Sequence, residues 1–420
     1  MSLGRRTDPP KGLTSAEINL ADLPLRDDLR GEQPYGAPQL DVPVLLNVNE
    51  NPYPPSEAVV ADIAVAVAQA ARQVNRYPDR EFLGLRADLA DFLAEDTGVR
   101  VSPEQVWAAN GSNEVMQQLL QAFGGPGRTA LSFAPTYSMY PEYARNTHTT
   151  WVLGHREPDF TIDLDHALAL IGEHRPSVVI LTSPNNPTGT ALPLTVVEEV
   201  LAVAPGVVVV DEAYAEFRRA GVSSALNLLS GHGNLIVTRT MSKAFAYAGG
   251  RLGYLASSAA VVDAVRIVRL PYHLSAIQQA AARAALSHRA EALAHISQLR
   301  AERDATVAWL RGLGLEVADS DANFVLFGRF GDRHAVWEQL LAQGVLIREV
   351  GPAGWLRVSI GSKSEMAAFR TALAGVLDAV EFAGWRGPEH GGDTDSTGGG
   401  SVREDGLDPV QAPDTEGARR

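Results

Sequence analysis

The sequence predicts an α/β fold with a largely parallel sheet, followed by a smaller α+β domain. Between about residues 106 and 257, short β-branched runs alternate with amphipathic stretches of helical period. One run, VVVV at 207–210, is entirely apolar, as a strand covered on both faces requires. After about residue 275 the pattern changes to long helical stretches with a few strand-like runs. Alternation of this kind is typical of helices packed around a sheet.

Seven strands are expected in the first region. They lie near residues 106–109, 129–133, 150–153, 178–182, 207–210, 236–238 and 252–255. Helical patterns separate several of them, and the segment 112–123 is the clearest example. One face of that helix would carry Val115, Met116, Leu119, Leu120 and Phe123. Strands that alternate with helices predict a mostly parallel sheet.

The second region begins with a helical stretch from about residue 275 to 310. It continues with a strand near 324–327, a helix near 335–342, strands near 345–348 and 356–360, and a last helix from about 364. We divide the chain into an N-terminal arm (1–45), a large domain (46–285), a small C-terminal domain (286–385) and a tail (386–420). The tail is acidic, rich in glycine and without an apolar period, so we expect it to be disordered.

The composition excludes several classes of protein. The chain contains no cysteine, which rules out disulfides, thiolate metal sites and a cysteine nucleophile. Its ten histidines form no HExxH pair, so we predict no metal site. A formal charge of −14 argues against a nucleic-acid or membrane-surface binder. No apolar run approaches the roughly 20 residues that span a bilayer and no secretory leader is seen, so we expect a cytoplasmic protein.

Lysine is rare in this chain, because only three of the 36 basic residues are lysine. Lys243 follows an apolar strand and has small and apolar neighbours in TMSKAFAYAGG. Burial lowers the pKa of an amine, and a desolvated lysine amine is a nucleophile suited to reaction with an aldehyde. The simpler alternative is a lysine that extends from the strand end into solvent.

Further polar groups are expected at the same edge of the sheet. Asp211 ends the run VVVVD, Tyr214 follows it, and SPNNPTG (183–189) follows another strand. Ligands of open α/β sheets bind beyond the carboxyl ends of the strands. The turn at 110–113 opens a helix and presents N–H groups to an anion, to which Arg251 adds a full charge. Simpler alternatives are a helix cap for Asp211 and an ordinary N-cap for the turn.

Ten motifs give the chain a family resemblance. They are NVNENPYPP, RYPD, AANGSNE, PTYSMYP, SPNNPTG, VVDEAYAEF, TRTMSKAFAYAGGRLGY, LPYHLS, DANFVLF and WLRVSIG. In this order and spacing they resemble the histidinol-phosphate aminotransferases, which are fold-type-I enzymes that depend on pyridoxal phosphate. The resemblance covers about residues 20 to 380. It implies a large domain with a mostly parallel seven-stranded sheet between helices, a smaller α+β C-terminal domain, and a homodimer with shared active sites.

The resemblance also implies roles for individual residues. Lys243 would hold pyridoxal phosphate covalently and later move a proton between the substrate's amino-bearing carbon and C4′ of the cofactor. Asp211 would pair with the pyridinium nitrogen, so that the ring can accept charge. The phenolic oxygen would be bound by Tyr214 and Asn186, with Tyr137 stacked on the ring. The cofactor phosphate would be held by Gly111, Ser112, Asn113, Thr240, Ser242 and Arg251, and by Tyr77 of the RYPD motif reaching across from the other subunit.

The implied reaction is a ping-pong exchange of an amino group between L-glutamate and imidazole-acetol phosphate, which gives 2-oxoglutarate and L-histidinol phosphate in histidine biosynthesis. One substrate carries a phosphate and the other two carboxylates, so a single site must accept different anions. The forked guanidinium groups of Arg357 and Arg348 match that need. Tyr35 and Asn186 are further candidates for the phosphate end.

Other functions stay open at this point. An aromatic amino-acid aminotransferase of the same family needs a carboxylate clamp but no phosphate clamp, and a threonine-phosphate decarboxylase is a more distant relative. A non-enzymatic regulator that binds pyridoxal phosphate usually carries a DNA-binding helix-turn-helix module. The segment before the matched core is short and rich in proline for such a module.

Overall fold

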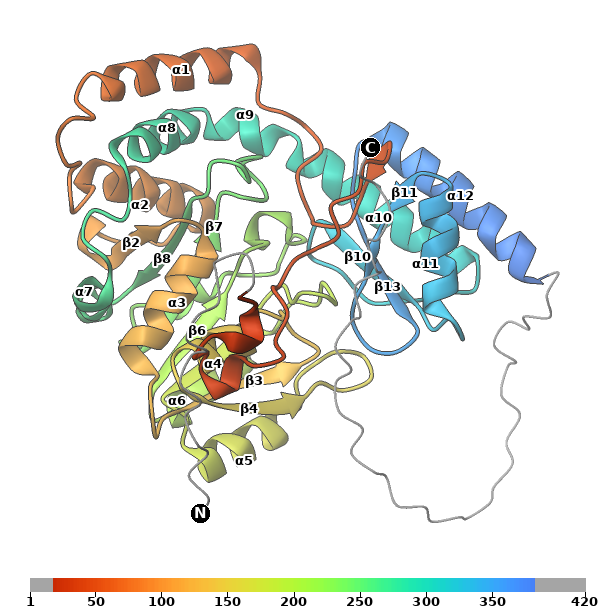
Figure 1. Cartoon of the computed structure of the whole chain (residues 1–420), viewed down its shortest axis with the longest axis horizontal. Helices are drawn as coiled ribbons and strands as arrows, with labels where there is room; N and C mark the ends of the chain where they lie inside the picture. Colours follow the sequence, from red (N-terminus) through yellow and green to blue (C-terminus); the bar gives the residue numbers. More distant parts are fainter. Residues whose placement is uncertain (1–17, 382–420) are drawn as a thin grey trace.

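The centre of the molecule is a seven-stranded sheet, shown in Figure 1 in a computed structural model that describes residues 18–381. Its strand order is β2-β8-β7-β6-β5-β3-β4. The strands are β2 (Val106–Ala109), β3 (Thr129–Ala134), β4 (Thr150–His155), β5 (Val178–Thr182), β6 (Val207–Asp211), β7 (Leu235–Thr240) and β8 (Gly253–Ser257). All neighbouring pairs from β7 to β4 are parallel, and β8 is antiparallel to both of its neighbours. The mostly parallel sheet predicted from the sequence is confirmed.

Helices cover both faces of this sheet (Figure 1). They are α2 (Leu83–Thr97), α3 (Ser112–Phe123), α4 (Tyr140–Asn146), α5 (Leu164–His174), α6 (Leu194–Val203) and α7 (Ala259–Val268). Farther out, α8 (Ala276–Ser287) packs against α2, and α1 (Glu57–Ala71) packs against α8. Every residue of the four adjacent strands β5 to β8 is buried. This explains why their sequences are apolar runs rather than alternating patterns.

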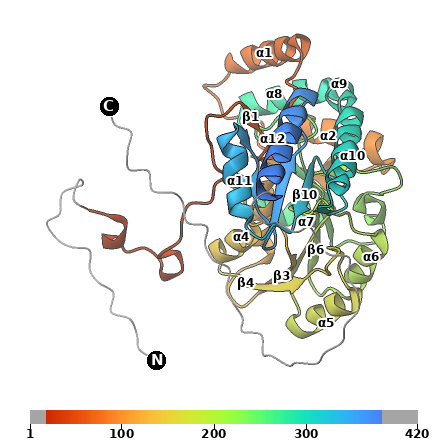
Figure 2. The same ribbon diagram turned by 90° about the vertical axis from the view of Figure 1, so that its right-hand side faces the viewer.

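The small domain is built on a second, antiparallel sheet with the order β12-β13-β10-β9. Its strands are β9 (Glu316–Val317), β10 (Phe324–Gly328), β12 (Arg348–Glu349) and β13 (Trp355–Ser359). The long α10 (Ile296–Gly312), α11 (Arg333–Ala342) and α12 (Lys363–Glu381) pack around this sheet (Figures 1 and 2), and α9 (Arg289–Ala294) leads into it from α8. The expected α+β character of this part is confirmed.

The segment before α1 joins the two domains. Its strand β1 (Val44–Leu45) pairs in parallel with β11 (Val345–Leu346) of the small domain. The next residue, Leu46, donates its N–H to the carbonyl of Leu346 and accepts from the N–H of Ser359. The expected boundary between arm and large domain, at residue 45, therefore falls inside a stretch that is tied to the small-domain strands.

The arm itself carries two short 3-10 helices, η1 (Leu20–Asp22) and η2 (Asp27–Leu29). It is linked to α4 by an ion pair between Glu32 and Arg145. Within residues 18–381, no helix has both the length and the apolar character needed to cross a bilayer. The expected tail (386–420) lies outside the described residues.

Candidate active site

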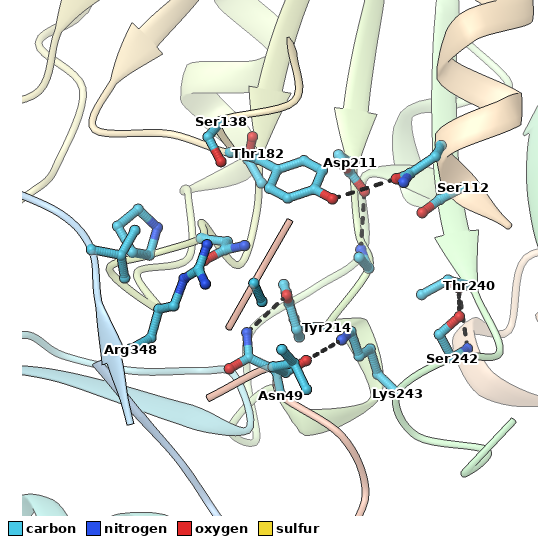
Figure 3. Close-up of a pocket in the computed structure, with 18 of the residues that line it drawn as sticks. Asn49, Ser112, Ser138, Thr182, Asp211, Tyr214, Thr240, Ser242, Lys243 and Arg348 are labelled. Atoms are coloured by element: carbon cyan, nitrogen blue, oxygen red, sulfur yellow. Dashed lines mark hydrogen bonds between the residues drawn. The ribbon is translucent and has the colours of Figure 1, made fainter. Parts of the chain in front are cut away.

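A cavity of about 290 Å³ lies between the carboxyl ends of the large-domain strands and the small domain (Figure 3). Most of the residues singled out in the sequence line it together. They are Tyr35, Ser112, Asn113, Tyr137, Asn186, Asp211, Tyr214, Thr240, Ser242, Lys243, Arg251, Arg348 and Arg357. Asp211 and Lys243 meet there because β6 and β7 are adjacent parallel strands, whose carboxyl ends share one edge of the sheet.

Asp211 ends β6 as a buried carboxylate with three donors. Its Oδ2 accepts from the hydroxyl of Tyr140 at 2.7 Å, and its Oδ1 accepts from Thr238 Oγ1 at 3.1 Å and from the N–H of Ala213 at 3.2 Å. Burial nevertheless raises the pKa of Asp211, because these neutral donors only partly offset the loss of water. A cationic partner in the cavity would stabilise the charged form.

Lys243 follows β7 and is half-buried, with its Nζ donating to the backbone carbonyl of Val48 at 2.8 Å (Figure 3). Burial, together with the nearby guanidinium groups of Arg357 and Arg251, lowers the pKa of this amine to about 8. The amine is therefore neutral, and nucleophilic, in a larger fraction of molecules than an exposed lysine. Its Nζ lies 6.0 Å from the ring centre of Tyr214.

Tyr214 lies deep in the cavity wall, only 5% exposed. Its hydroxyl oxygen accepts a hydrogen bond from Nδ2 of Asn49 at 3.1 Å. Burial raises the pKa of this hydroxyl, so it stays protonated at neutral pH. Tyr214 can therefore donate its own hydrogen to a ligand.

The start of α3 forms the far end of the cavity. Gly111 has a φ of 83° and α3 begins after it with no side-chain cap, so the first N–H groups of the helix are open to an anion. Opposite them lie Thr240 and Ser242, whose hydroxyl oxygens are 3.0 Å apart. Arg251 donates to Ser242 Oγ at 3.4 Å and brings the positive charge that an anion site needs.

Two guanidinium groups lie on the small-domain side. Arg357 on β13 is 6% exposed, and its Nη2 donates to the backbone carbonyl of Asn47 at 2.8 Å. Its Nη1 donates to the side-chain oxygen of Asn186, and the guanidinium lies 5.1 Å from the ring centre of Phe324. Burial lowers the pKa of Arg357 to about 10, so it stays a cation at neutral pH. Arg348 faces the cavity from β12, across from Ser112, Thr240 and Ser242 (Figure 3).

Aromatic side chains complete the wall. Tyr137 is half-buried beside Tyr140, with the ring centres 5.5 Å apart and the planes nearly perpendicular, and its hydroxyl is 3.5 Å from Asn113 Oδ1. Tyr35 comes from the arm, and its hydroxyl accepts from Ser138 Oγ at 3.1 Å. Of the predicted site residues, Gly111 and Tyr77 do not line the cavity; Gly111 directly precedes Ser112, which does, whereas Tyr77 lies apart. It is 80% exposed, and its ring stacks on Tyr272 with the centres 4.4 Å apart.

Several residues of the site were not singled out in the sequence. Tyr140 and Thr238 bond Asp211, Asn49 bonds Tyr214, and Gly253 allows β8 to pass the start of α3. A Cβ at Gly253 would overlap the backbone nitrogen of Ser112. The signal for Tyr140 and Asn49 was present, because they belong to the PTYSMYP and NVNENPYPP motifs. A buried carboxylate at a strand end also requires donors, although the sequence alone does not say which residues supply them.

The residues present fit pyridoxal phosphate. The cavity offers an amine of lowered pKa at Lys243 for the aldehyde and a buried carboxylate at Asp211 for a cationic ring nitrogen. At the opposite end, the open start of α3 and Arg251 suit a phosphate. In the described part of the chain, no three His, Asp or Glu side chains are grouped so that they could hold a metal ion.

Comparison with known proteins gives a consistent set of relatives. Residues 42–373 match the family model described as aminotransferase class I and II. The chain is 64% identical over 360 residues to histidinol-phosphate aminotransferase 3 of Burkholderia lata, covering 86% of this chain and 97% of that protein. It is also 64% identical over 356 residues to the histidinol-phosphate aminotransferase of Thermobifida fusca, covering 85% and 96%. Among solved structures, the histidinol-phosphate aminotransferase of Sinorhizobium meliloti in complex with pyridoxal-5′-phosphate matches with a TM-score of 0.69 and 25% identity, covering 81% of this chain and 92% of that one.

Proposed function

The chain belongs to the class I and II aminotransferases and is a pyridoxal-phosphate-dependent transaminase, and we propose that its substrates are L-histidinol phosphate and 2-oxoglutarate. The products would be imidazole-acetol phosphate and L-glutamate, and the reaction would serve histidine biosynthesis. One observation carries the proposal. The cavity that holds Lys243 and Asp211 is closed on its small-domain side by two arginines, Arg348 and Arg357, which suit the phosphate and carboxylate groups of these substrates.

Lys243 has two tasks in the proposed reaction. Pyridoxal phosphate, when bound, supplies an aldehyde carbon that captures amines and a ring that accepts the electrons released when the substrate's C–H bond breaks. Nζ of Lys243 would hold the cofactor and, when free, would take up the proton from the substrate's amino-bearing carbon and return it at C4′. This step needs the neutral amine, and the pKa of about 8 makes that form accessible near neutral pH.

The remaining large-domain residues orient the cofactor. The carboxylate of Asp211 holds a proton on the ring nitrogen, and in doing so gains the cationic partner that its burial requires. Tyr214 and Asn186 bind the phenolic oxygen, and Tyr137 covers the ring. The α3 start with Gly111, Ser112 and Asn113 binds the phosphate together with Thr240, Ser242 and Arg251.

Substrate selection is assigned to the small domain and the arm. Arg357 is oriented by hydrogen bonds to Asn47 and Asn186, so it offers a positioned cation to a carboxylate or phosphate. Arg348 and Tyr35 border the same cavity and are candidates for the phosphate end of histidinol phosphate. A charged, hydrogen-bonding site of this kind discriminates strongly against a substrate that lacks the anionic group.

A homodimer is part of the proposal. Tyr77 and Tyr272 are stacked on each other, and the residues just before Tyr272 in the chain include the exposed apolar side chains of Ile267 (84% exposed) and Leu270 (73% exposed). Apolar side chains exposed to this degree support our proposal that a second copy covers this surface. From there Tyr77 would reach the cofactor phosphate of the other subunit. Sedimentation of the purified protein, and loss of the dimer in an Ile267→Asp variant, would test this. The cytoplasmic location stays a prediction from the sequence.

The substrate assignment is tested by incubating the protein with histidinol phosphate and 2-oxoglutarate and measuring glutamate. We expect efficient turnover, and an Arg348→Ala variant should lose it strongly, with little loss of any activity measured with phenylalanine. Absence of glutamate together with good turnover of phenylalanine would favour the aromatic aminotransferase instead. The glutamate half-reaction alone distinguishes an enzyme from a non-enzymatic regulator, because only an enzyme loses its visible cofactor band when glutamate is added.

A further inference from the structure

Two side chains of β13 hold the chain segment that crosses the active site before α1. Arg357 Nη2 donates to the carbonyl of Asn47 at 2.8 Å, and Ser359 Oγ accepts from the N–H of Asn49 at 2.9 Å. Arg357 and Ser359 are two positions apart on one strand, so both point to the same face of the small sheet. The small domain therefore fixes this segment at two places.

The hydrogen bonds at Asn49 have a defined direction. Since Ser359 Oγ already accepts from the backbone N–H of Asn49, its hydrogen is free to donate, and it does so to Oδ1 of Asn49 at 2.9 Å. With Oδ1 used as an acceptor, the Nδ2 of the same amide faces Tyr214 and donates to its hydroxyl oxygen at 3.1 Å (Figure 3). Asn49 is 2% exposed and Ser359 3%, so bulk water does not compete for these groups.

This direction fixes what the Tyr214 hydroxyl can do. Its oxygen is occupied as an acceptor by Asn49, so its single hydrogen is left to point into the cavity. If Asn49 were an acceptor instead, the Tyr214 hydrogen would turn toward Asn49 and away from a ligand. A buried hydrogen-bonded chain of this kind is a device for setting donor direction.

We infer that Asn49 is a positioning residue, which with Ser359 directs the Tyr214 hydroxyl to donate to the phenolic oxygen of pyridoxal phosphate. The inference rests on the proposed role of Tyr214. It extends that role to a residue of the segment before α1 and to a strand of the small domain. Asn49 acts through Tyr214 and has no step of its own in the reaction.

The consequence is measurable on the resting protein without substrate. A donor to the phenolic oxygen stabilises the anionic form of that oxygen. It therefore lowers the pKa of the proton that the phenolic oxygen shares with the lysine–cofactor linkage. Loss of the donor therefore raises the pH at which the visible band of the bound cofactor changes. We expect a rise of about one pH unit for Asn49→Asp, since the carboxylate keeps the size and the Ser359 bond but must accept from Tyr214. Asn49→Gly, which suits the φ of 57°, should shift in the same direction by less.

The decisive experiment combines these changes with Tyr214→Phe. In the Tyr214→Phe background, Asn49→Gly should leave unchanged the pH at which the visible cofactor band changes. Asn49→Asp should shift that pH only by the effect of its added negative charge. Asn323→Ala is the matched control, because Asn323 Nδ2 donates to the backbone carbonyl of Asn49 at 3.0 Å but does not touch Tyr214. It should lower the melting temperature without moving the titration.

Three outcomes would overturn the inference. An unchanged titration in Asn49→Asp and Asn49→Gly, while Tyr214→Phe shifts, removes the role of Asn49 alone. Equal shifts in the Tyr and Phe backgrounds show that Asn49 acts without Tyr214. An unchanged titration in Tyr214→Phe itself removes the role of Tyr214 and the inference with it. None of these readings depends on whether histidinol phosphate is the substrate, because no substrate is added.

Discussion

Lys243 Nζ donates a hydrogen bond to the backbone carbonyl of Val48 at 2.8 Å, which places this amine against the segment that precedes α1. A single neutral carbonyl cannot replace the water that an ammonium group loses on burial. The positive charges of Arg357 and Arg251 add to the cost, and together these effects bring the pKa of Lys243 to about 8. Lys243 is thus held in place while its charged form is disfavoured.

Covalent capture of pyridoxal phosphate should therefore follow this pKa. With cofactor removed and then added back, we expect the rate of appearance of the visible band to rise with pH and level off above about 8, because only the neutral amine attacks an aldehyde. At pH 7 roughly a tenth of Lys243 would be neutral, against well under a thousandth for an ordinary lysine. A midpoint near the ordinary lysine value would contradict this explanation.

The same capture should involve Lys243 alone. Borohydride reduction of the holoenzyme is expected to fix the cofactor on one peptide, although the chain also contains Lys11 and Lys363. Lys243→Ala should bind cofactor without the visible band of the linkage. Label on a second lysine peptide would show that attachment is not specific.

An Asp211→Asn variant should separate binding from chemistry. The amide keeps the size of the carboxylate and can still accept from Tyr140, but it cannot hold a proton on the ring nitrogen. We expect the cofactor to stay bound while the glutamate half-reaction slows by about 100-fold or more, because the carboxylate no longer stabilises the charge on the ring nitrogen. The rate is read from the decay of the visible band. Asp321→Asn is the control, since that buried carboxylate bonds the N–H of Arg219 and lies outside the cavity wall.

The large-domain part of the site could be predicted from the sequence because it depends on strand ends. The apolar run VVVVD shows where β6 ends. Because β6 and β7 are neighbouring parallel strands, Asp211 and the segment before Lys243 lie at the same edge of the sheet. Tertiary contacts between distant segments were not predictable in this way. Asn49 bonds Ser359 across 310 positions and Arg357 bonds Asn186 across 171. No local period carries information about such pairs.

The segment 345–348 shows a second limit. Its apolar residues predict one strand, whereas the structure divides it between two sheets, with Val345–Leu346 paired to β1 and Arg348–Glu349 paired to β13. At the division, the carbonyl of Ile347 accepts from the indole Nε1 of Trp337 at 2.9 Å instead of from a strand. The partner strand β1 lies 301 residues earlier in the chain, so the sequence around 345–348 gives no sign of it.

Gly253→Ala should weaken cofactor binding through the phosphate end of the site. The added methyl group would overlap the backbone at Gly111 and Ser112, so the start of α3 must move away from the position that an anion needs. We expect a lower affinity for pyridoxal phosphate, by about tenfold or more, in a fluorescence titration of the cofactor-free protein. Gly249→Ala is the matched control, because a Cβ there meets no atom within 4 Å. Equal affinities in the two variants would contradict the crowding argument.

A buried ion cluster joins β7, α2 and the segment that follows β6. Arg239, 1% exposed, lies 2.9 Å from Glu212, 2.6 Å from Asp96 and 3.3 Å from Glu216. Arg218 is the second cation of the cluster, so three carboxylates share two guanidinium groups. Burial raises the pKa of Glu216 to about 7, with the charge of Asp96 adding to the effect and Arg239 opposing it.

A Glu216→Gln variant should consequently flatten the pH dependence of stability. The folded-state pKa of about 7 lies above the ordinary value of 4.5, so the stability from protonated Glu216 is fully present below pH 4.5 and lost as the pH rises through 7. At about 1.4 kcal/mol per pH unit, this loss is at most roughly 3.5 kcal/mol in the free energy of unfolding. Urea unfolding at pH 5 and pH 8 should show a smaller difference for Glu216→Gln than for the native protein. Glu173→Gln, at a side chain 72% exposed, is the control and should show the same difference in unfolding free energy between the two pH values as the native protein. If Glu216→Gln also showed that difference, the pH dependence would belong to other groups.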